Sequence, residues 1–152
     1  MIPVGRIAAF QLYLVFLLLH TNPNHPKIMR YQVSVQDTIP SESNTIILHD
    51  RDKKPLRSAW LSRKEKEYIN SLDEDAPSIH HFNRYSHSVL VVLVKKKSHT
   101  YQTAESCRIA GSEVAGMRKK LSIKDVFVTS TMPEADFAEA VIEGILLASY
   151  RF

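Results

Sequence analysis

Cysteine and glycine are both scarce in this sequence, and each shortage excludes a class of site. Only one of the 152 residues is cysteine, Cys107, so an internal disulfide is excluded, as is any zinc site built from several thiolates. The chain has four glycines, and none directly follows the apolar runs that end at Val94 and Val128. Because phosphate-binding loops need glycine between a strand and the next helix, the sequence offers little support for nucleotide binding.

Charge of one sign is not in large excess either. Twenty Lys and Arg residues face 16 Asp and Glu residues, which gives a net charge of +4. The longest basic runs, 95–97 and 118–120, hold three charges each, with Tyr101 as the aromatic residue near the first. A nucleic-acid surface normally combines a longer basic stripe with several aromatic platforms. We therefore expect a mixed, solvated surface and no nucleic-acid partner.

The seven histidines lack the spacing of a metal site. His80 and His81 are adjacent, so on a strand they would point to opposite faces, and no H-x-x-x-H or H-E-x-x-H pattern occurs. We expect solvated histidines at strand edges or in loops, and no metal or other cofactor in this chain. Cys107 falls on the apolar stripe of a predicted helix, which favours a role in core packing over a role as a nucleophile.

An apolar stretch, Ile7 to Leu19, stands near the start of the chain with Gln11 as its one polar residue. As a helix it would span about 20 Å, less than the roughly 30 Å of a bilayer core. We consider three interpretations of residues 1–28. In the first, translation starts naturally at Met29 of a cytoplasmic protein. In the second, residues 7–19 are a signal or membrane anchor of an exported protein, and in the third the stretch is a folded part of the domain.

From Met29 onward, short β-type runs alternate with longer helical patterns. Strands are predicted at Tyr31–Val35, Thr45–His49, Ile79–Asn83, Ser88–Val94 and Asp125–Ser130, and helices at about Ser62–Leu72, Thr103–Leu121 and Glu134–Tyr150. Two segments have the pattern of a capping box, one at Ser62 with Glu65 and one at Thr131 with Glu134. In the second predicted helix, Gly111 and Gly116 are expected to allow close packing against the sheet.

This order predicts an α/β fold with a mixed sheet and helices on both faces, in three layers. The run Ser88–Val94 shows no alternation of apolar and polar residues, which is typical of a strand buried on both faces. The last four elements follow the strand, helix, strand, helix order of a parallel crossover. We assign residues 29–152 to one domain and residues 1–28 to a leader or linker.

The last predicted helix contains Glu143, Gly144, Leu147 and Tyr150, with Phe152 beyond them, in an E-G-x-x-L-x-x-Y-x-F segment. With the strand VFVTS and the helix AESCRIAGSEVAGMRKKL before it, this segment resembles the end of the N-terminal domain of leucyl aminopeptidases, also called cytosol aminopeptidases. The stretch WLSRKEKEYI resembles a variant found in shorter members. The resemblance is good over 100–152, fair over 31–94 and absent over 1–28.

The resemblance implies a macro-domain-like fold for the domain and hexameric assembly for the family. Leucyl aminopeptidases remove N-terminal residues from peptides at a two-metal site that commonly holds zinc, manganese or magnesium. Their metal ligands lie in the catalytic domain, which includes an N-T-D-A-E-G-R segment with no counterpart here. No catalytic residue carries over, so we expect a non-catalytic domain that is inactive alone. Its implied partners are an aminopeptidase catalytic domain or subunit and further copies of the same protein.

The predicted interface of this domain is the outer apolar side of the last helix, formed by Ile142, Leu146 and Tyr150, with Phe152 beyond. We expect this stripe to be exposed and to bind either an aminopeptidase subunit or another copy. An alternative from a different class is a macro-like module that binds a nucleotide or ADP-ribose, an inference from fold analogy alone.

Overall fold

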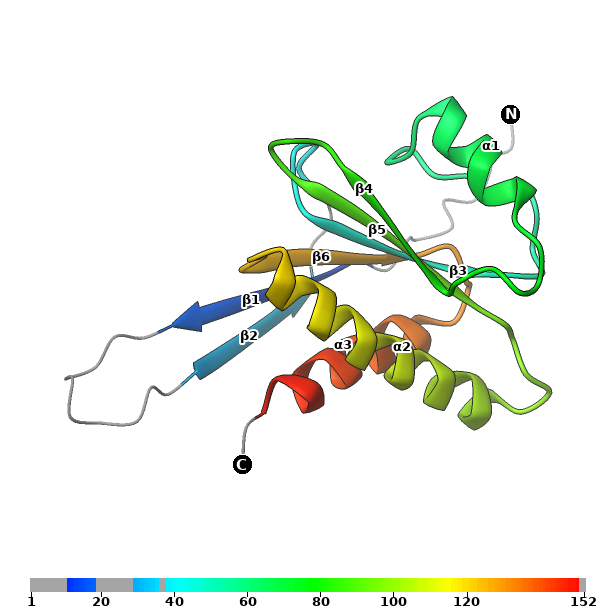
Figure 1. Ribbon diagram of the computed structural model, residues 1–152. Helices are drawn as coiled ribbons and strands as arrows, with labels where there is room; N and C mark the ends of the chain where they lie inside the picture. Colours follow the sequence, from blue (N-terminus) through cyan, green and yellow to red (C-terminus); the bar gives the residue numbers. More distant parts are fainter. Residues whose placement is uncertain (1–10, 19–28, 36–37, 151–152) are drawn as a thin grey trace, which may run out of the picture.

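The computed structural model describes residues 11–18, 29–35 and 38–150, and within them the chain forms six strands and three helices (Figure 1). The strands are β1 (Gln11–Leu18), β2 (Met29–Val35), β3 (Thr45–Asp50), β4 (Ile79–Asn83), β5 (Ser88–Val94) and β6 (Asp125–Ser130). The helices are α1 (Arg63–Ser71), α2 (Thr100–Lys120) and α3 (Ala135–Ser149). The predicted α/β class is confirmed.

All six strands join one mixed, open sheet in the order β2-β1-β6-β3-β5-β4. The central strand β3 runs parallel to β5 on one side and to β6 on the other. The outer strands are antiparallel, with β4 beside β5, and β1 between β6 and β2. All six residues of β3 are buried, the polar Thr45, His49 and Asp50 among them, as expected for a central strand covered on both faces.

Alternate residues of the central strands contribute to two separate hydrophobic clusters, because successive side chains on a strand point to opposite faces. Ile46 and Leu48 of β3 lie in the cluster that contains the buried residues of α2 and α3. Ile47, between them, lies in the second cluster, together with Ile69 of α1. Helices α2 and α3 therefore cover one face, and α1 lies against the other (Figure 1).

Helix α1 begins with the predicted capping box. The Ser62 hydroxyl accepts a hydrogen bond from the Glu65 backbone N–H at 3.4 Å, and the Glu65 carboxylate accepts one from the Ser62 N–H at 2.6 Å. The second predicted box is wrong, because Glu134 is the N-cap of α3 and its side chain makes no capping hydrogen bond. The hydroxyl of Thr131 lies instead 2.6 Å from a ring nitrogen of His49.

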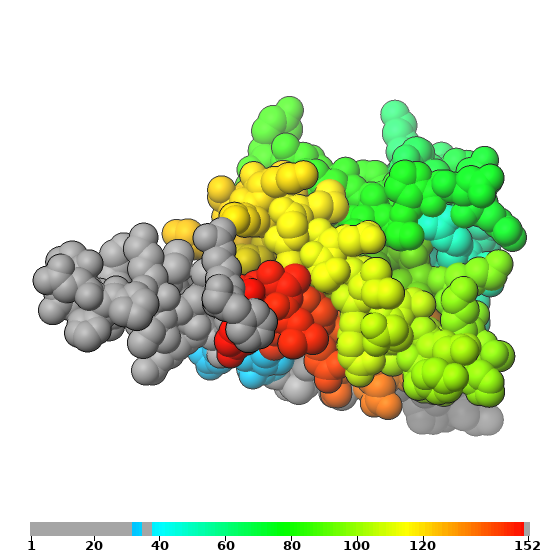
Figure 2. Space-filling model, turned by 60° about the horizontal axis from the view of Figure 1, so that its bottom comes forward, coloured from blue at the N-terminus to red at the C-terminus, as the bar shows by residue number. Residues whose placement is uncertain are grey.

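Helices α2 and α3 lie side by side (Figure 2), and glycine allows their backbones to touch. A Cβ atom at Gly111 would lie 2.2 Å from the Val141 carbonyl oxygen, and one at Gly144 would lie 2.0 Å from the Arg108 carbonyl oxygen. The expectation that Gly111 and Gly116 serve packing against the sheet is therefore wrong. Gly111 serves the contact with α3, and a Cβ atom at Gly116 would meet nothing within 4 Å.

The apolar stretch near the start of the chain contributes strand β1, which pairs with β6 in a register that sets Tyr13 opposite Phe127. This placement is what the third interpretation of the stretch expects, that it is a folded part of the domain. Residues 1–10 and 19–28 lie outside the described residues, so a start at Met29 and a leader both stay predictions. Within the described ranges, no helix has the length and apolarity that a membrane span requires.

Candidate functional site

The residues predicted to form an exposed interface on α3 differ widely in exposure. Ile142 is only 3% exposed and belongs to the core, and Leu146 is half-buried against the same cluster. Tyr150 is 62% exposed, and Phe152 lies outside the described residues. The expectation of one exposed stripe is therefore wrong for Ile142, because α3 packs against both the sheet and α2 and so buries two of its sides.

The exposed apolar surface of α3 is instead confined to its last turn. Leu147 in this turn is 67% exposed, and Tyr150, the C-cap residue directly after the helix, is 62% exposed. The Tyr150 backbone N–H donates to the carbonyls of Leu146 and Leu147, which holds the end of the helix in place. Leu147 was not among the predicted interface residues, since the sequence does not show where α2 stops covering α3.

The preceding part of the same segment is fixed internally. The Arg108 guanidinium of α2 lies 2.7 Å from the Glu143 carboxylate and 3.4 Å from that of Glu105. The hydrogen bond with Glu143 is the main reason that the pKa of Arg108 is raised. Gly144 lies directly against the backbone of Arg108. The E-G half of the segment therefore anchors α3 to α2, and the L-x-x-Y half faces outward.

A second cluster of functional groups surrounds His49 at the carboxyl ends of the parallel strands. His49 was expected to be solvated, but it is 5% exposed, because it lies near the end of a central strand that is covered on both faces. Its Nε2 atom donates to the Lys53 carbonyl at 2.6 Å, so in the neutral ring Nδ1 accepts from the Thr131 hydroxyl, also at 2.6 Å. Burial lowers the pKa of His49, against the opposing effects of the Lys53 hydrogen bond and the Asp50 charge.

His49 thus joins β3 to the loops that follow β3 and β6. At the same end of the sheet, Lys96 forms an ion pair with Glu134, and this hydrogen bond is the largest cause of the lowered pKa of Glu134. Lys95 lies 3.9 Å from the carboxylates of both Asp52 and Glu74, with all three side chains about half exposed or more. Two lysines at this end of the sheet therefore pair with three acidic side chains.

A polar hollow of about 310 Å³ opens next to these charges, between α2 and the segment before β4. Its lining combines apolar residues, among them Leu93, Val94 and Ile109, with five charged ones, Arg51, Glu74, Lys95, Lys97 and Glu113. Its size falls at the lower end of the range for small-molecule sites, but such sites hold only a few polar groups. Over the described part of the chain, no three His, Cys, Asp or Glu residues come together in a way that could hold a metal ion.

A larger hollow, of about 450 Å³, lies at the opposite, amino end of the parallel strands. Asn44 crosses this end, since its side-chain oxygen accepts from the Ser88 N–H at 2.9 Å and its amide donates to the Asp125 carbonyl at 3.3 Å. His81 and His87 also line the hollow. These contacts align the starts of β5 and β6, and we assign Asn44 a structural role.

Cys107 and His80 complete the set of candidate reactive groups. Cys107 is fully buried in the core, and burial raises the pKa of its thiol to about 12, so the thiolate is scarce at neutral pH. The predicted core role of Cys107 is confirmed. His80 was also expected to be solvated, but its side chain is buried, with 8% exposed, because Tyr68 of α1 packs edge-on against it.

Comparisons of this chain with protein-family profiles, with curated proteins and with solved structures found no match.

Proposed function

We propose that this chain is a non-catalytic assembly domain of the leucyl aminopeptidase type, which binds an aminopeptidase subunit through the last turn of α3. In this proposal, the removal of N-terminal residues from peptides belongs to the catalytic subunit. The zinc, manganese or magnesium ions of the two-metal site also belong to that subunit. The domain contributes packing surface and helps to hold an oligomer together.

The observation that carries the proposal is the division of the E-G-x-x-L-x-x-Y segment into two halves. Glu143 and Gly144 are engaged in the contact with Arg108, whereas Leu147 on the following turn and Tyr150 at the C-cap are about two-thirds exposed. Large apolar and aromatic side chains that are exposed together mark interaction surfaces, and tyrosine is enriched among residues that dominate binding energy. The backbone that carries both side chains is fixed, so little ordering is needed on binding.

Binding to a leucyl aminopeptidase catalytic subunit, measured by titration calorimetry, tests this proposal. Leu147→Glu should weaken binding at least about tenfold, because it places a charge in an apolar contact, and a loss of 1.4 kcal/mol is a factor of about ten. Ile109→Glu is the matched control, since Ile109 is 54% exposed on α2, where it lines the polar hollow. The proposal fails if the wild-type chain does not bind, or if both substitutions weaken binding equally.

We also propose that the sheet with its two covered faces is a macro-like, three-layer arrangement. The two hydrophobic clusters on opposite faces of β3 support this finer description. The polar hollow at the carboxyl end of β5 lies where ligands bind in open α/β sheets, which keeps an ADP-ribose or nucleotide module as the second candidate function. Calorimetric titration with ADP-ribose separates the two, since the assembly proposal predicts no binding and millimolar or tighter binding would favour the module.

We further propose a cytoplasmic location, as the name cytosol aminopeptidase implies for the family. The rival interpretation is an exported or anchored protein whose residues 7–19 act as a signal. N-terminal sequencing of the protein from fractionated cells decides between them. A mature N-terminus beyond residue 20, found outside the cytoplasm, would contradict the cytoplasmic proposal.

A further inference from the structure

Strand β4 forms one outer edge of the sheet, and its pairing with β5 shows which backbone groups point outward. The Leu93 N–H donates to the Ser78 carbonyl at 2.7 Å, and the Arg84 N–H donates to the His87 carbonyl at 2.9 Å. Hydrogen-bonded and non-hydrogen-bonded residues alternate along an antiparallel strand. The backbone groups of His80 and Phe82 therefore also point toward β5, and those of Ile79, His81 and Asn83 point away from the sheet.

The outward edge of β4 lacks the features that usually protect an edge strand. Natural edge strands are guarded by lysine or other charges, by proline, by bulges or by a covering segment. The sequence of β4, IHHFN, has no charged residue and no proline, and its register with β5 continues without a bulge from Ile79 to Asn83. Across the described ranges, no other strand pairs with β4 on this side.

The outward backbone N–H and carbonyl groups of β4 can pair with the same groups of a second β4 strand. If two β4 strands run antiparallel with the His81 residues opposite each other, then Ile79 of one copy faces Asn83 of the other. Every outward N–H and carbonyl of the three residues then meets a partner of the opposite kind. We propose that β4 pairs in this way with β4 of a second copy of this chain, so that the two sheets join across a two-fold axis.

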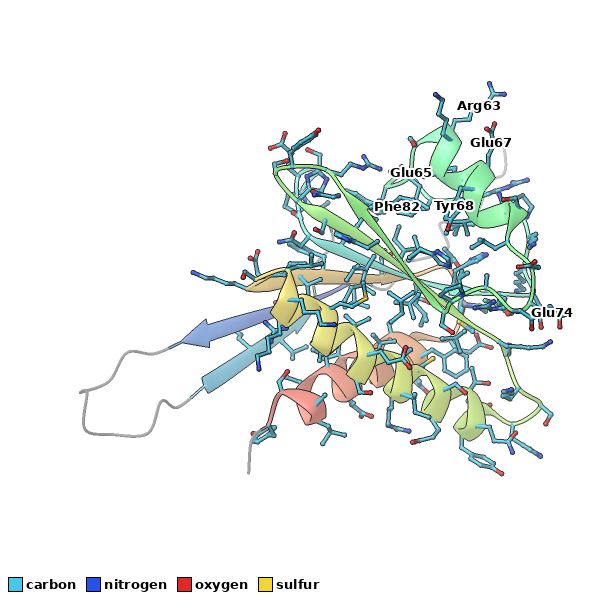
Figure 3. The ribbon with its side chains drawn as sticks, in the orientation of Figure 1. Arg63, Glu65, Glu67, Tyr68, Glu74 and Phe82 are labelled. Atoms are coloured by element: carbon cyan, nitrogen blue, oxygen red, sulfur yellow. The ribbon has the colours of Figure 1, made fainter. Side chains whose placement is uncertain are left out.

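The side chains on the α1 face of β4 also fit this register. His80 of one copy would lie opposite Phe82 of the other, in a non-hydrogen-bonded pair where the side chains approach most closely. Both residues already pack edge-on against Tyr68: the ring centroid of His80 lies 5.6 Å from that of Tyr68, and the ring centroid of Phe82 lies 6.2 Å from it (Figure 3). Tyr68 is 48% exposed. Pairing would therefore join two small aromatic clusters into one across the axis.

A second copy suits this edge better than an unrelated extended peptide. In the proposed register, His80 of each copy meets Phe82 of the other, so the chain itself supplies the aromatic partners that an unrelated peptide would have to carry at matching positions. The contact is small, since β4 has five residues and stable interfaces bury about 1,200–2,000 Å². We therefore expect a reversible dimer that dissociates in the micromolar range.

Sedimentation equilibrium of the full chain from about 1 to 300 µM tests the pairing, because this range spans micromolar dissociation constants. His81→Pro removes an outward N–H without removing a bond to β5, and proline is tolerated on edge strands in that orientation. His81→Ala is the matched control, because it loses the same imidazole and its contact with Ser88 but keeps the N–H. We expect wild type and His81→Ala to dimerise, and His81→Pro to stay monomeric with its circular dichroism unchanged.

Cross-linking provides a readout that does not depend on how well the proline variant folds. In the proposed register, the two thiols introduced by His81→Cys would sit on Cα atoms about 5.5 Å apart, within disulfide range. Tyr85→Cys is the control, because Tyr85 is fully exposed beyond the end of the strand and far from the axis. The native Cys107 is buried and does not compete. We expect His81→Cys to form disulfide-linked dimers at least about tenfold faster than Tyr85→Cys.

Three outcomes overturn the pairing: a wild-type chain that is monomeric throughout the range, a folded His81→Pro variant that dimerises like wild type, or equal cross-linking at the two positions. The pairing rests on the assembly role proposed above, but the two can fail separately. A monomeric chain that still binds an aminopeptidase subunit through Leu147 refutes β4 pairing alone. A β4-paired dimer that binds no aminopeptidase subunit refutes the proposed function alone.

Discussion

The two faces of the sheet are packed very differently. Among the described residues, the cluster that includes α2 and α3 contains nineteen buried residues, whereas the one that includes α1 contains seven. The first face has two helices in backbone contact at Gly111 and Gly144. The second has one short helix, positioned by a capping box and by the ion pair between Glu65 and Arg84 at 2.5 Å.

This difference separates the residues that stabilise the domain from the surfaces that are exposed to a partner. The α2 and α3 side supplies most of the buried apolar surface, and its outward-facing apolar surface on α3 is confined to the last turn. The α1 side adds local polar contacts, and next to it lies the unguarded edge of β4. Substitutions on the first side should therefore cost more stability than equivalent substitutions on the second.

Phe137 and Ile69 give the largest contrast. Phe137→Ala should lower the free energy of unfolding by about 4 kcal/mol, since the ring is fully buried in the larger cluster. Ile69→Ala should cost about 2 kcal/mol, because the smaller cluster beneath α1 can collapse more easily around the cavity. Urea unfolding of both variants measures these costs. Equal losses would remove the distinction between the two faces.

The helix contact on the larger face can be tested with a pair of identical substitutions. Gly144→Ala should destabilise the chain by about 3 kcal/mol, because its Cβ atom would collide with the Arg108 backbone. Gly116→Ala should stabilise it by about 1 kcal/mol, since that position is open and alanine favours the helix. Thermal unfolding shows both signs, and a stable Gly144→Ala variant would contradict the close backbone contact.

The capping box on the smaller face predicts a more modest change. Ser62→Ala should lower the free energy of unfolding by about 1 kcal/mol, because it removes the hydroxyl that accepts from the Glu65 N–H. Ser71→Ala, at the other end of α1, should change it by less than about 0.5 kcal/mol, since Ser71 is exposed and caps no N–H. If chemical unfolding gives the same loss for both variants, the box contributes nothing.

The smallest effect concerns pH, and it depends on buried histidines. Burial lowers the pKa of His49 below its ordinary value of about 6.5, so folding favours the neutral ring. The free energy of unfolding should therefore be highest above about pH 6.5 and should fall as the pH drops below that value. The pKa of His80 is also lowered, again mainly by burial, and acts in the same direction.

Substituting His49 isolates its share of this pH dependence. His49→Gln should flatten the dependence below about pH 6.5, because glutamine takes up no proton there. Urea unfolding at several pH values provides the comparison. An unchanged slope in His49→Gln would show that the buried contacts of His49 do not control the acid response.

Local patterns were enough to predict most of the elements from the sequence. The predicted bounds of β4, β5 and β6 match the observed ones. For β5 and β6 the reason is a run of β-branched and apolar residues with polar or charged residues at its ends. The capping box of α1 involves residues three apart and needs no knowledge of the fold. Features that depend on distant partners were missed.

Three examples show why these features could not be read from the sequence. The hydroxyl of Thr131 pairs with His49, 82 residues away, and so it does not cap α3. Ile142 is buried because α3 packs against α2 as well as the sheet, which no periodicity reveals. Strand β1 depends on pairing with β6, which lies far along the sequence. In each case a tertiary contact decided between local alternatives.

The most direct test of the central claim is a hydrolysis assay of the purified full chain with leucine-p-nitroanilide, in the presence of manganese or zinc. A non-catalytic assembly domain should give no turnover above the metal-only blank, with either metal and at any chain concentration. Metal-dependent turnover that rises in proportion to the chain would contradict the account. It would mean that residues assigned here to structure and assembly form an active site.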